Sequence, residues 1–549
     1  MTSQPNYDAA QLAAIQTDAA RALVSATAGA GKTAVLVGHI QHLVESGVHP
    51  QRIICLTFTN AAARVMEARL GYRVNYCGTL HSWLLRLLNT HGSLIGFAPG
   101  VGVVDDEQAE ELLADIAAGQ RCKWTKDERD AARNDWTQHT FNPTKAQLCV
   151  AAYRRRLRES NCLDFDGILH FGKQVVEQMA KRKMWHGIHL LVDEFQDTSD
   201  DFMAIYDALP AEKRFYVGDK CQSIFGYLGS DVDNFDREVA GGATVVRMET
   251  SYRCAASICR CATALVAAGG GTEKTLPRPG APAGRAELHE FADMEAECKW
   301  IAKTIRELEC ERDCAILLRT NALCDDYRAV LEGYGLPIAR REQRGLPQDW
   351  PQVRALVTVL QNPDNDILCE SFIAVLRGKA QAALSRREAI AAQVSLNAHC
   401  LHLPPDLDAQ SAVAYAVGKH PSAESSAKLL ASAATLPEDA GVGELLIALA
   451  EPEKAASTGG VVVSTVHSAK GMEFSTCFIP AMENGILPSN RDFSDPASLA
   501  EARRICYVAI TRAKQNCLMS WCRTRRERFG RFEDVARQPS RFAVEAGLT

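Results

Sequence analysis

The sequence predicts an α/β protein with two parallel-sheet cores, each interrupted by a helical insertion. Two observations predict this fold. Short apolar runs alternate with helical patterns in residues 1–96 and again from about 314 onwards, and such alternation is typical of parallel sheets. Longer helical stretches, at about 97–172 and 371–458, separate the strand-rich parts. The length of 549 residues suits several domains of roughly 150 residues each.

The first half is expected to form one sheet. Apolar runs predict buried strands at 22–25, 52–57, 188–192, 214–217 and 244–248. A helix is expected from about 33 to 45, after a glycine-rich turn, and another from 61 to 70. Between 97 and 172 the pattern changes to charged helices, so this stretch is expected to be an insertion into the first core.

The second half repeats this organisation. Residues 269–284 are rich in glycine and proline and indicate a linker or long loop. A buried strand is predicted at 314–318, and strand patterns resume at 459 after alanine-rich helices. The first core is predicted to span 1–96 and 173–268, with its insertion at 97–172, and the second core to span 269–370 and 459–549, with its small insertion at 371–458.

Composition excludes several classes of protein. Apolar residues make up 47% of the chain and charged residues 23%, which is ordinary for a globular protein and argues against disorder. No apolar run approaches the 18 residues of a membrane span, and the first residues lack a signal-peptide pattern, so a cytoplasmic protein without membrane contact is expected. The 19 cysteines include no C-x-x-C pair, which disfavours a zinc site. The net charge of −6 means that any nucleic-acid contact must come from particular residues.

The first chemical signal is ATAGAGKT, residues 26–33. A glycine-rich turn leads from a strand into a helix, where backbone N–H groups can cradle phosphates. Lys32 would reach the terminal phosphates and the Thr33 hydroxyl would bind Mg²⁺. The strict phosphate-loop pattern has glycine at position 26, where this chain has alanine. An ordinary glycine-containing turn is therefore the alternative.

The second signal is LLVDEFQD, residues 190–197. An apolar strand ends in two adjacent carboxylates. Asp193 suits a Mg²⁺ site, and Glu194 suits a general base that activates the attacking water. The alternative is an acidic helix start in which Asp197 caps the following helix, but that does not explain the Asp-Glu pair. Together the two signals predict a nucleotide hydrolase.

Further segments, in order along both halves, give the chain a strong family resemblance. They are TFTNAAAR (57–64), GTLHS (78–82), VGDKCQSIFGY (217–227), SYR (251–253), VSTVHSAKGMEF (463–474) and EARRICYVAITRAK (501–514). With the two signals above, they resemble the motifs of superfamily 1 DNA helicases of the UvrD/Rep type. The resemblance implies two RecA-like P-loop NTPase cores with ATP and Mg²⁺ in the cleft between them.

The resemblance implies roles for residues of this cleft. Gln11 would pair with the adenine edge, Tyr252 would stack on the ring, and Glu473 would hold the ribose side. Gln222 would sense the terminal phosphate, and Arg253 and Arg512 would stabilise charge on the transferring phosphoryl group. The implied sets are: catalytic, Glu194, Gln222, Arg253 and Arg512; nucleotide-binding, Gln11, Ala28, Gly29, Ala30, Gly31, Lys32, Thr33, Tyr252 and Glu473; metal-binding, Thr33 and Asp193.

The resemblance also implies contacts with single-stranded DNA. Phe58 and Tyr227 match base-stacking positions, while Thr79, His81 and His467 match positions near the DNA backbone. An isolated phenylalanine after a strand is more often a core residue, so the role of Phe58 rests on the resemblance.

Two activities stay open at this stage. One is an ATP-dependent helicase or translocase that moves 3′→5′ on single-stranded DNA and opens 3′-tailed duplexes. The other is a DNA-stimulated regulatory ATPase subunit that activates a protein partner such as a nuclease or repair factor. The small second insertion favours the second activity, as does Leu228, where the family usually has arginine. Unwinding by the purified chain alone would separate the two.

Overall fold

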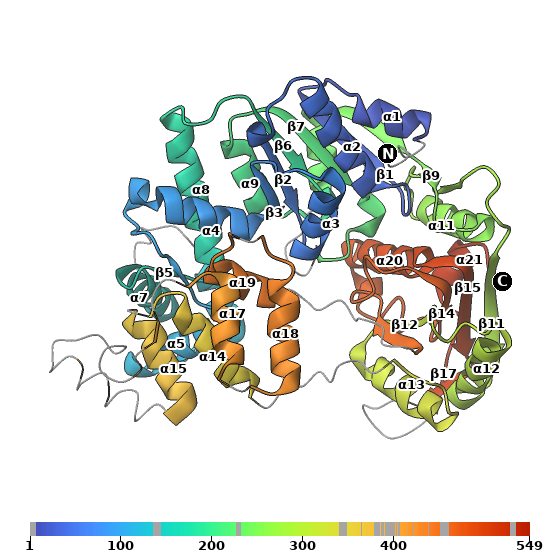
Figure 1. Ribbon diagram of the computed structural model, residues 1–549. Coiled ribbons are helices and arrows are strands. Elements are labelled where there is room, and N and C mark those ends of the chain that lie inside the picture. Colours follow the sequence, from blue (N-terminus) through green and yellow to red (C-terminus); the bar gives the residue numbers. More distant parts are fainter. Residues whose placement is uncertain are drawn as a thin grey trace.

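The computed structural model describes most of the chain. The described residues are 7–134, 144–226, 232–339, 349–363, 365–377, 385, 389, 401, 403–404, 407–419, 421–437, 439–450, 460–526 and 534–548. Two large parallel sheets and a block of helices make up most of the molecule (Figure 1). None of the helices formed by these residues combines the length and apolar character needed to cross a bilayer.

The first sheet has six strands in the order β3-β2-β6-β7-β1-β8, and all neighbours are parallel. The strands are β1 (Arg21–Ala26), β2 (Ile53–Thr57), β3 (Tyr76–Thr79), β6 (Ile188–Val192), β7 (Ala211–Gly218) and β8 (Thr244–Met248). Five of them coincide with the apolar runs that predicted strands. The sixth, β3, was not predicted, because its four residues lack a long apolar run.

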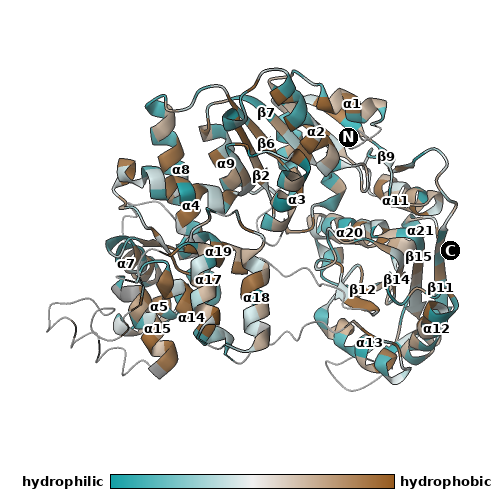
Figure 2. Ribbon diagram, viewed as in Figure 1, coloured by the Kyte–Doolittle hydropathy of each residue, from teal (hydrophilic) through white to brown (hydrophobic). Residues whose placement is uncertain are grey.

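Helices cover both faces of this sheet. Alternate residues of one strand point to opposite faces, so Val24 packs in one apolar cluster while Leu23 packs in another. The covering helices are α1 (Ala9–Ile15), α2 (Lys32–Glu45), α3 (Asn60–Leu70), α4 (Leu80–His91), α8 (Phe165–Lys181), α9 (Asp200–Ala208) and α10 (Asp233–Ala240). In Figure 2 most helices show both brown and teal, as expected when one side packs against a core.

The second sheet has five parallel strands in the order β11-β15-β14-β12-β13. They are β11 (Arg285–Phe291), β12 (Cys314–Leu318), β13 (Val462–Thr465), β14 (Phe474–Ile479) and β15 (Ala513–Cys522). Leu317 packs towards α11 (Ala256–Ala268) and α20 (Pro496–Thr511), whereas Ile316 packs towards α12 (Met294–Glu307) and α13 (Asn321–Gly333). The predicted α/β class with parallel sheets is therefore confirmed.

Helices of both insertions share one apolar cluster. The first set is α5 (Asp106–Gly119), α6 (Lys126–Asn134) and α7 (Lys145–Glu159); the second is α14 (Trp350–Leu360), α15 (Asp366–Arg377), α17 (Ala409–Val417), α18 (Ala423–Ala433) and α19 (Val442–Ala450). Figure 1 shows the second set beside α4, α5 and α7 and apart from the second sheet. The helical packing begins at α14, ahead of residue 371, and the six-segment division stays a prediction.

Polar contacts hold the second insertion against the first insertion and against the first core. Gln361 accepts a hydrogen bond from the Val103 N–H and donates one to the Val103 carbonyl, both at 2.7 Å. Arg354 lies 2.6 Å from the Asp105 carboxylate, and the buried Glu444 of α19 lies 2.6 Å from Arg86 of α4. The second insertion interrupts the second core in sequence but packs on the first half of the chain in space.

Candidate nucleotide cleft and DNA-binding face

The glycine-rich loop joins β1 to α2 at the cleft between the two cores. Gly29 and Gly31 have positive φ angles of 76° and 86°, which glycine adopts without strain. A Cβ on Gly29 would lie 2.6 Å from the Arg253 Cβ, and one on Gly31 would lie 2.9 Å from Gln11 Nε2. Gly31 provides no side chain to cap α2, so the free N–H groups of the first turn are available to an anion.

Gln11 and Tyr252 lie against this loop. The Gln11 side-chain amide donates to the Ala30 carbonyl at 3.0 Å and accepts from the Asp8 N–H at 3.0 Å. The Tyr252 N–H donates to the Gly29 carbonyl at 2.9 Å, and its hydroxyl donates to Asp8 at 2.7 Å. Burial and this hydrogen bond raise the pKa of Tyr252 to about 12. The ring is 41% exposed, so its face is free to stack on a planar base.

Two carboxylates follow β6 at the other side of the cleft. Glu194 adopts a left-handed conformation with φ of 50°, which is uncommon outside glycine and marks functional sites in many proteins. Its Oε2 lies 3.1 Å from Lys32 Nζ and accepts a hydrogen bond from Gln196 at 2.7 Å. The buried Asp193 Oδ1 has no hydrogen-bond partner among the described residues.

Burial and neighbouring charges shift the pKa values of the carboxylates in the cleft. Burial, together with the charge of Glu194, raises the pKa of Asp193. Burial would also raise the pKa of Glu194, but the cations Lys32 and Lys470 outweigh it and lower that pKa. Glu194 therefore stays ionised at neutral pH, as a general base must.

A chain of contacts joins the cores on the phosphate side of the cleft. The side-chain amide of Gln222 donates to Asp219 at 2.6 Å, and its Oε1 accepts from Arg512 at 3.0 Å. Arg512 ends α20 of the second core and is 1% exposed. Burial, with some help from the nearby Arg253, lowers its pKa to about 10. Arg512 still carries its charge at neutral pH, in a place where water screens it little.

Arg253 and Glu473 meet at the outer part of the cleft. The Arg253 guanidinium donates to Glu473 at 2.7 Å and to the Thr511 carbonyl at 3.4 Å. Lys514 lies 3.1 Å from the same glutamate. The structure thus brings together the nucleotide-site residues expected from the sequence, including Thr33 in the first turn of α2 and the buried Ala28 and Ala30.

A buried ion pair between the cores was missed by the sequence analysis. Lys470 follows β13, and its Nζ lies 2.8 Å and 2.6 Å from the two carboxylate oxygens of Asp197. The same Nζ donates to the backbone carbonyl of Gln222 at 2.8 Å. The alternative in which Asp197 caps the next helix is wrong, because Ser199 caps α9 through the Phe202 N–H. Asp197 lies in the segment 190–197 and Lys470 in the segment 463–474, and this membership of family motifs was the only sign in the sequence that the two residues have a role.

The candidate DNA-binding face lies next to this ion pair. Phe58 follows β2, is 38% exposed, and stacks on Phe225 with ring centroids 5.6 Å apart and an angle of 8°. Lys470 Nζ lies 4.6 Å from the centre of the Phe225 ring, and the ring centroids of His467 and Phe225 are 6.4 Å apart. Phe225 was also missed, although it stands in the same motif as Tyr227. Tyr227 and Leu228 lie outside the described residues.

Thr79 and His81 are engaged with the protein. Thr79 is 6% exposed and caps α4 by accepting from the Ser82 N–H at 3.4 Å. His81 packs edge-on against Phe165 and Phe202 at 5.7 Å and 5.8 Å. Burial lowers the pKa of His81, and that of His467, to about 4. Both imidazoles are therefore neutral and would contact a phosphate by hydrogen bonding, not by charge.

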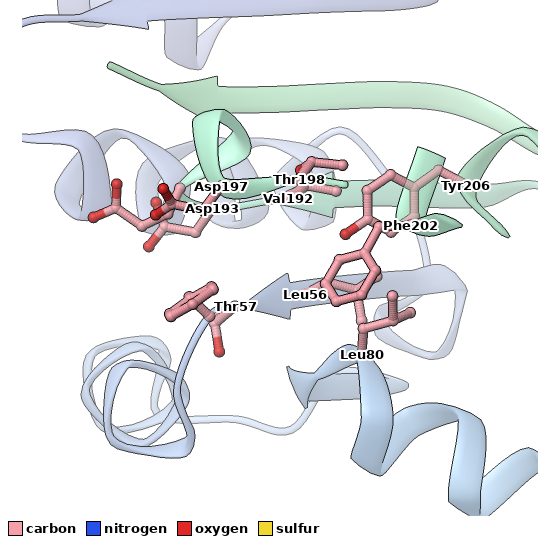
Figure 3. A pocket seen from close by; sticks show the side chains of 11 residues that line it. Leu56, Thr57, Leu80, Val192, Asp193, Asp197, Thr198, Phe202 and Tyr206 are labelled. Carbon is pink, nitrogen blue, oxygen red and sulfur yellow. The ribbon is translucent and has the colours of Figure 1, made fainter. Parts of the chain in front are cut away.

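A small pocket at the ends of β2 and β6 borders both regions. Figure 3 shows Asp193 and Asp197 at one end of it and Phe202 and Tyr206 at the other. Phe58 also lines the pocket. The carboxylates of the cleft and a candidate stacking ring therefore border one small space.

Comparisons with known proteins agree with this arrangement. The family model for the UvrD/REP helicase N-terminal domain matches residues 7–239, and that for the UvrD-like helicase C-terminal domain matches residues 442–524. The chain is 25% identical to ATP-dependent DNA helicase PcrA of Leuconostoc citreum, covering 97% of this chain and 84% of the relative. It is 27% identical to ATP-dependent DNA helicase UvrD1 of Mycobacterium leprae (92% and 81% covered) and 26% identical to DNA helicase II of Escherichia coli (95% and 85% covered).

Proposed function

Because this chain belongs to the UvrD/REP helicase family, we propose that it is an ATP-dependent DNA helicase that moves 3′→5′ on single-stranded DNA. The observation that supports this most is the contact between Arg512 of the second core and Gln222 of the first, at 3.0 Å. A cation of one core reaches a phosphate-side residue of the other, so nucleotide chemistry and core closure depend on each other.

In this proposal the ionised Glu194 accepts the proton of the attacking water, with Gln196 holding its carboxylate. Lys32, Arg253 and Arg512 place positive charge around the transferring phosphoryl group, where charge develops in the transition state. Tyr252 stacks on the adenine ring, and Gln11 pairs with its edge.

Mg²⁺ fits the same cleft. The Asp193 Oδ1 is buried without a hydrogen-bond partner among the described residues, and Thr33, with its hydroxyl group, lies in the first turn of α2. Carboxylate and hydroxyl oxygens are the ligands that Mg²⁺ prefers. When bound, the ion would neutralise negative charge on the phosphates, and Asp193 and Thr33 would hold it.

The DNA substrate proposed here is a single strand, reached from the 3′ tail of a duplex. Phe58 and Tyr227 would stack on bases, while Thr79, His81 and His467 would lie near the backbone. Location in the cytoplasm, and activation of a protein partner such as a nuclease or repair factor, stay predictions from the sequence.

Steady-state kinetics and unwinding assays test the proposal together. The purified chain should hydrolyse ATP faster when single-stranded DNA is added, and it should open a 3′-tailed duplex but not a 5′-tailed one. Lys32→Ala should abolish turnover, because the cation on the terminal phosphates is lost. Turnover indifferent to DNA would contradict the proposal, and DNA-stimulated turnover without unwinding would favour the regulatory subunit.

A further inference from the structure

Three buried hydroxyl groups meet beneath the glycine-rich loop. The Tyr507 hydroxyl lies 3.0 Å from Thr27 Oγ1 and 3.1 Å from Thr275 Oγ1, and the two threonine hydroxyls are hydrogen-bonded to each other. All three residues are less than 9% exposed. Each comes from a different part of the chain: Thr27 starts the loop, Thr275 lies in the segment between the cores, and Tyr507 belongs to α20 of the second core.

The Tyr507 hydroxyl also contacts the loop backbone and the phosphate side of the cleft. The Ala28 N–H donates to it at 3.4 Å, and it lies 3.5 Å from Asp219 Oδ2. A tyrosine hydroxyl has one proton to donate and lone pairs to accept. The Ala28 N–H therefore takes an accepting position, and the single proton serves either a threonine or the carboxylate. Burial, together with the charge of Asp219, raises the Tyr507 pKa well above 10, so the proton stays in place.

Tyr507 stands five residues before Arg512, which caps the C-terminal end of the same helix, α20. The Tyr507 carbonyl accepts from the Thr511 hydroxyl at 2.9 Å, and the Val508 carbonyl accepts from Arg512 Nε at 3.1 Å. Tyr507 through Thr511 are all 2% exposed or less. A helix packed this tightly moves as one body, so any shift that brings Arg512 to Gln222 also brings the Tyr507 hydroxyl to the loop.

We propose that Tyr507 is a positioning residue that makes the conformation of the phosphate-binding loop depend on the seating of α20. The inference deepens the proposed function and rests on it, since it concerns the nucleotide cleft of that function. Its basis is that a buried hydroxyl cluster is favourable only when all of its members are paired. With α20 in place, Thr27 and Ala28 are fixed at the base of the loop and the N–H groups beyond them are arranged for phosphate. With α20 withdrawn, the loop loses the Tyr507 hydroxyl and with it the contacts to Thr27 and Ala28.

The test uses the full chain and the variant Tyr507→Phe, which removes one oxygen atom and keeps the ring. The KM for ATP, measured with saturating single-stranded DNA, should rise about tenfold, which corresponds to one lost hydrogen bond of ordinary strength. The kcat should stay within about twofold, since the residue does not touch the reacting atoms. Thr27→Val should give the same change, and the double variant should be no worse than either single one, because both break one cluster.

Tyr216→Phe is the matched control. Tyr216 is equally buried in the first core, and its hydroxyl has no hydrogen-bond partner among the residues that the structure describes. Its KM and kcat should equal those of the natural chain. The melting temperature of each variant, measured in parallel, shows whether it is folded.

Equilibrium titration with fluorescently labelled ADP separates the two claims. If the natural chain lacks DNA-stimulated turnover, the proposed function fails, and weaker ADP binding by Tyr507→Phe alone still supports the link to the loop. If the natural chain is active and Tyr507→Phe keeps its KM and ADP affinity within twofold, the inference is overturned. An equal change in Tyr216→Phe would overturn it as well.

Discussion

The nucleotide cleft and the aromatic face beside it are built from opposite kinds of contact. In the cleft, charged side chains are buried and paired, as in the Lys470–Asp197 contact at 2.6 Å. On the face, Phe58 is 38% exposed and stacks on Phe225. A buried charge pair is favourable only when its geometry is good, whereas an exposed aromatic ring can stack on any base. Loss of a catalytic charge in the cleft should therefore nearly abolish turnover, whereas loss of a ring on the face should weaken binding by degrees.

After the Lys32→Ala variant described above, the largest effect is expected from Arg512→Ala. If the guanidinium acts mainly on the charge of the transition state, kcat should fall roughly 10³-fold or more, as for other arginine fingers. The KM for ATP should change far less. A raised KM with unchanged kcat would instead mean that Arg512 contributes only to ground-state binding.

Glu194→Gln is expected to follow, with a loss of roughly 10²- to 10⁴-fold in kcat. Glutamine has nearly the shape of glutamate but cannot take a proton from water. Binding of labelled ADP should persist, which distinguishes lost chemistry from a lost site. Near-normal turnover would remove Glu194 from the role of base.

Lys470→Met removes one partner of the buried pair between the cores. Removing one charge of such a pair leaves the other uncompensated and costs roughly 3–5 kcal/mol. The expected result is a lower melting temperature and weaker stimulation of turnover by DNA. Adding Asp197→Asn should recover part of both losses, because the orphaned charge is gone.

The matched control for this pair is Lys213→Met. Lys213 lies 3.1 Å from Asp18, whose side chain is 88% exposed, and an ion pair at the surface contributes little. The variant should behave like the natural chain. If Lys470→Met is as mild as Lys213→Met, the contact between the cores has no role in closure.

The same contrast explains what the sequence could predict. The family and the α/β fold followed from motif order and from apolar runs, because local patterns determine where strands such as β6 form. The Lys470–Asp197 pair, the hydroxyl cluster around Tyr507 and the packing of α19 against α4 could not be predicted in this way. Each joins residues distant in sequence, and no local pattern specifies which of many charged or hydroxyl side chains meet.

The predicted site residues divide along the same line. Gln11, Glu194, Gln222 and Arg512 gather in the cleft because each lies near the end of a helix or strand that borders it. The alternative of Asp197 as a helix cap could be excluded only with the structure, because its partner Lys470 comes from the other core. The assignments of catalytic and DNA-binding roles stay predictions until the variants are measured.

The smallest effect is expected on the aromatic face. Phe58→Ala and Phe225→Ala should each weaken single-stranded DNA binding by about 1–3 kcal/mol, the usual value of one base–aromatic stack. The two losses should not add, because the rings stack on each other and removing one exposes the other. The salt dependence should stay the same, since each neutralised phosphate adds about 0.7 to the slope of log affinity against log salt and stacking neutralises none.

Phe493→Ala is the control for these two variants and should leave affinity unchanged. It removes a phenyl ring that is 46% exposed and lies outside the family motifs. Binding titrations at several salt concentrations measure both quantities. A changed slope for Phe58→Ala would mean that the ring positions a cation instead of a base, and unchanged affinity would make Phe58 a packing residue of the pocket at the ends of β2 and β6.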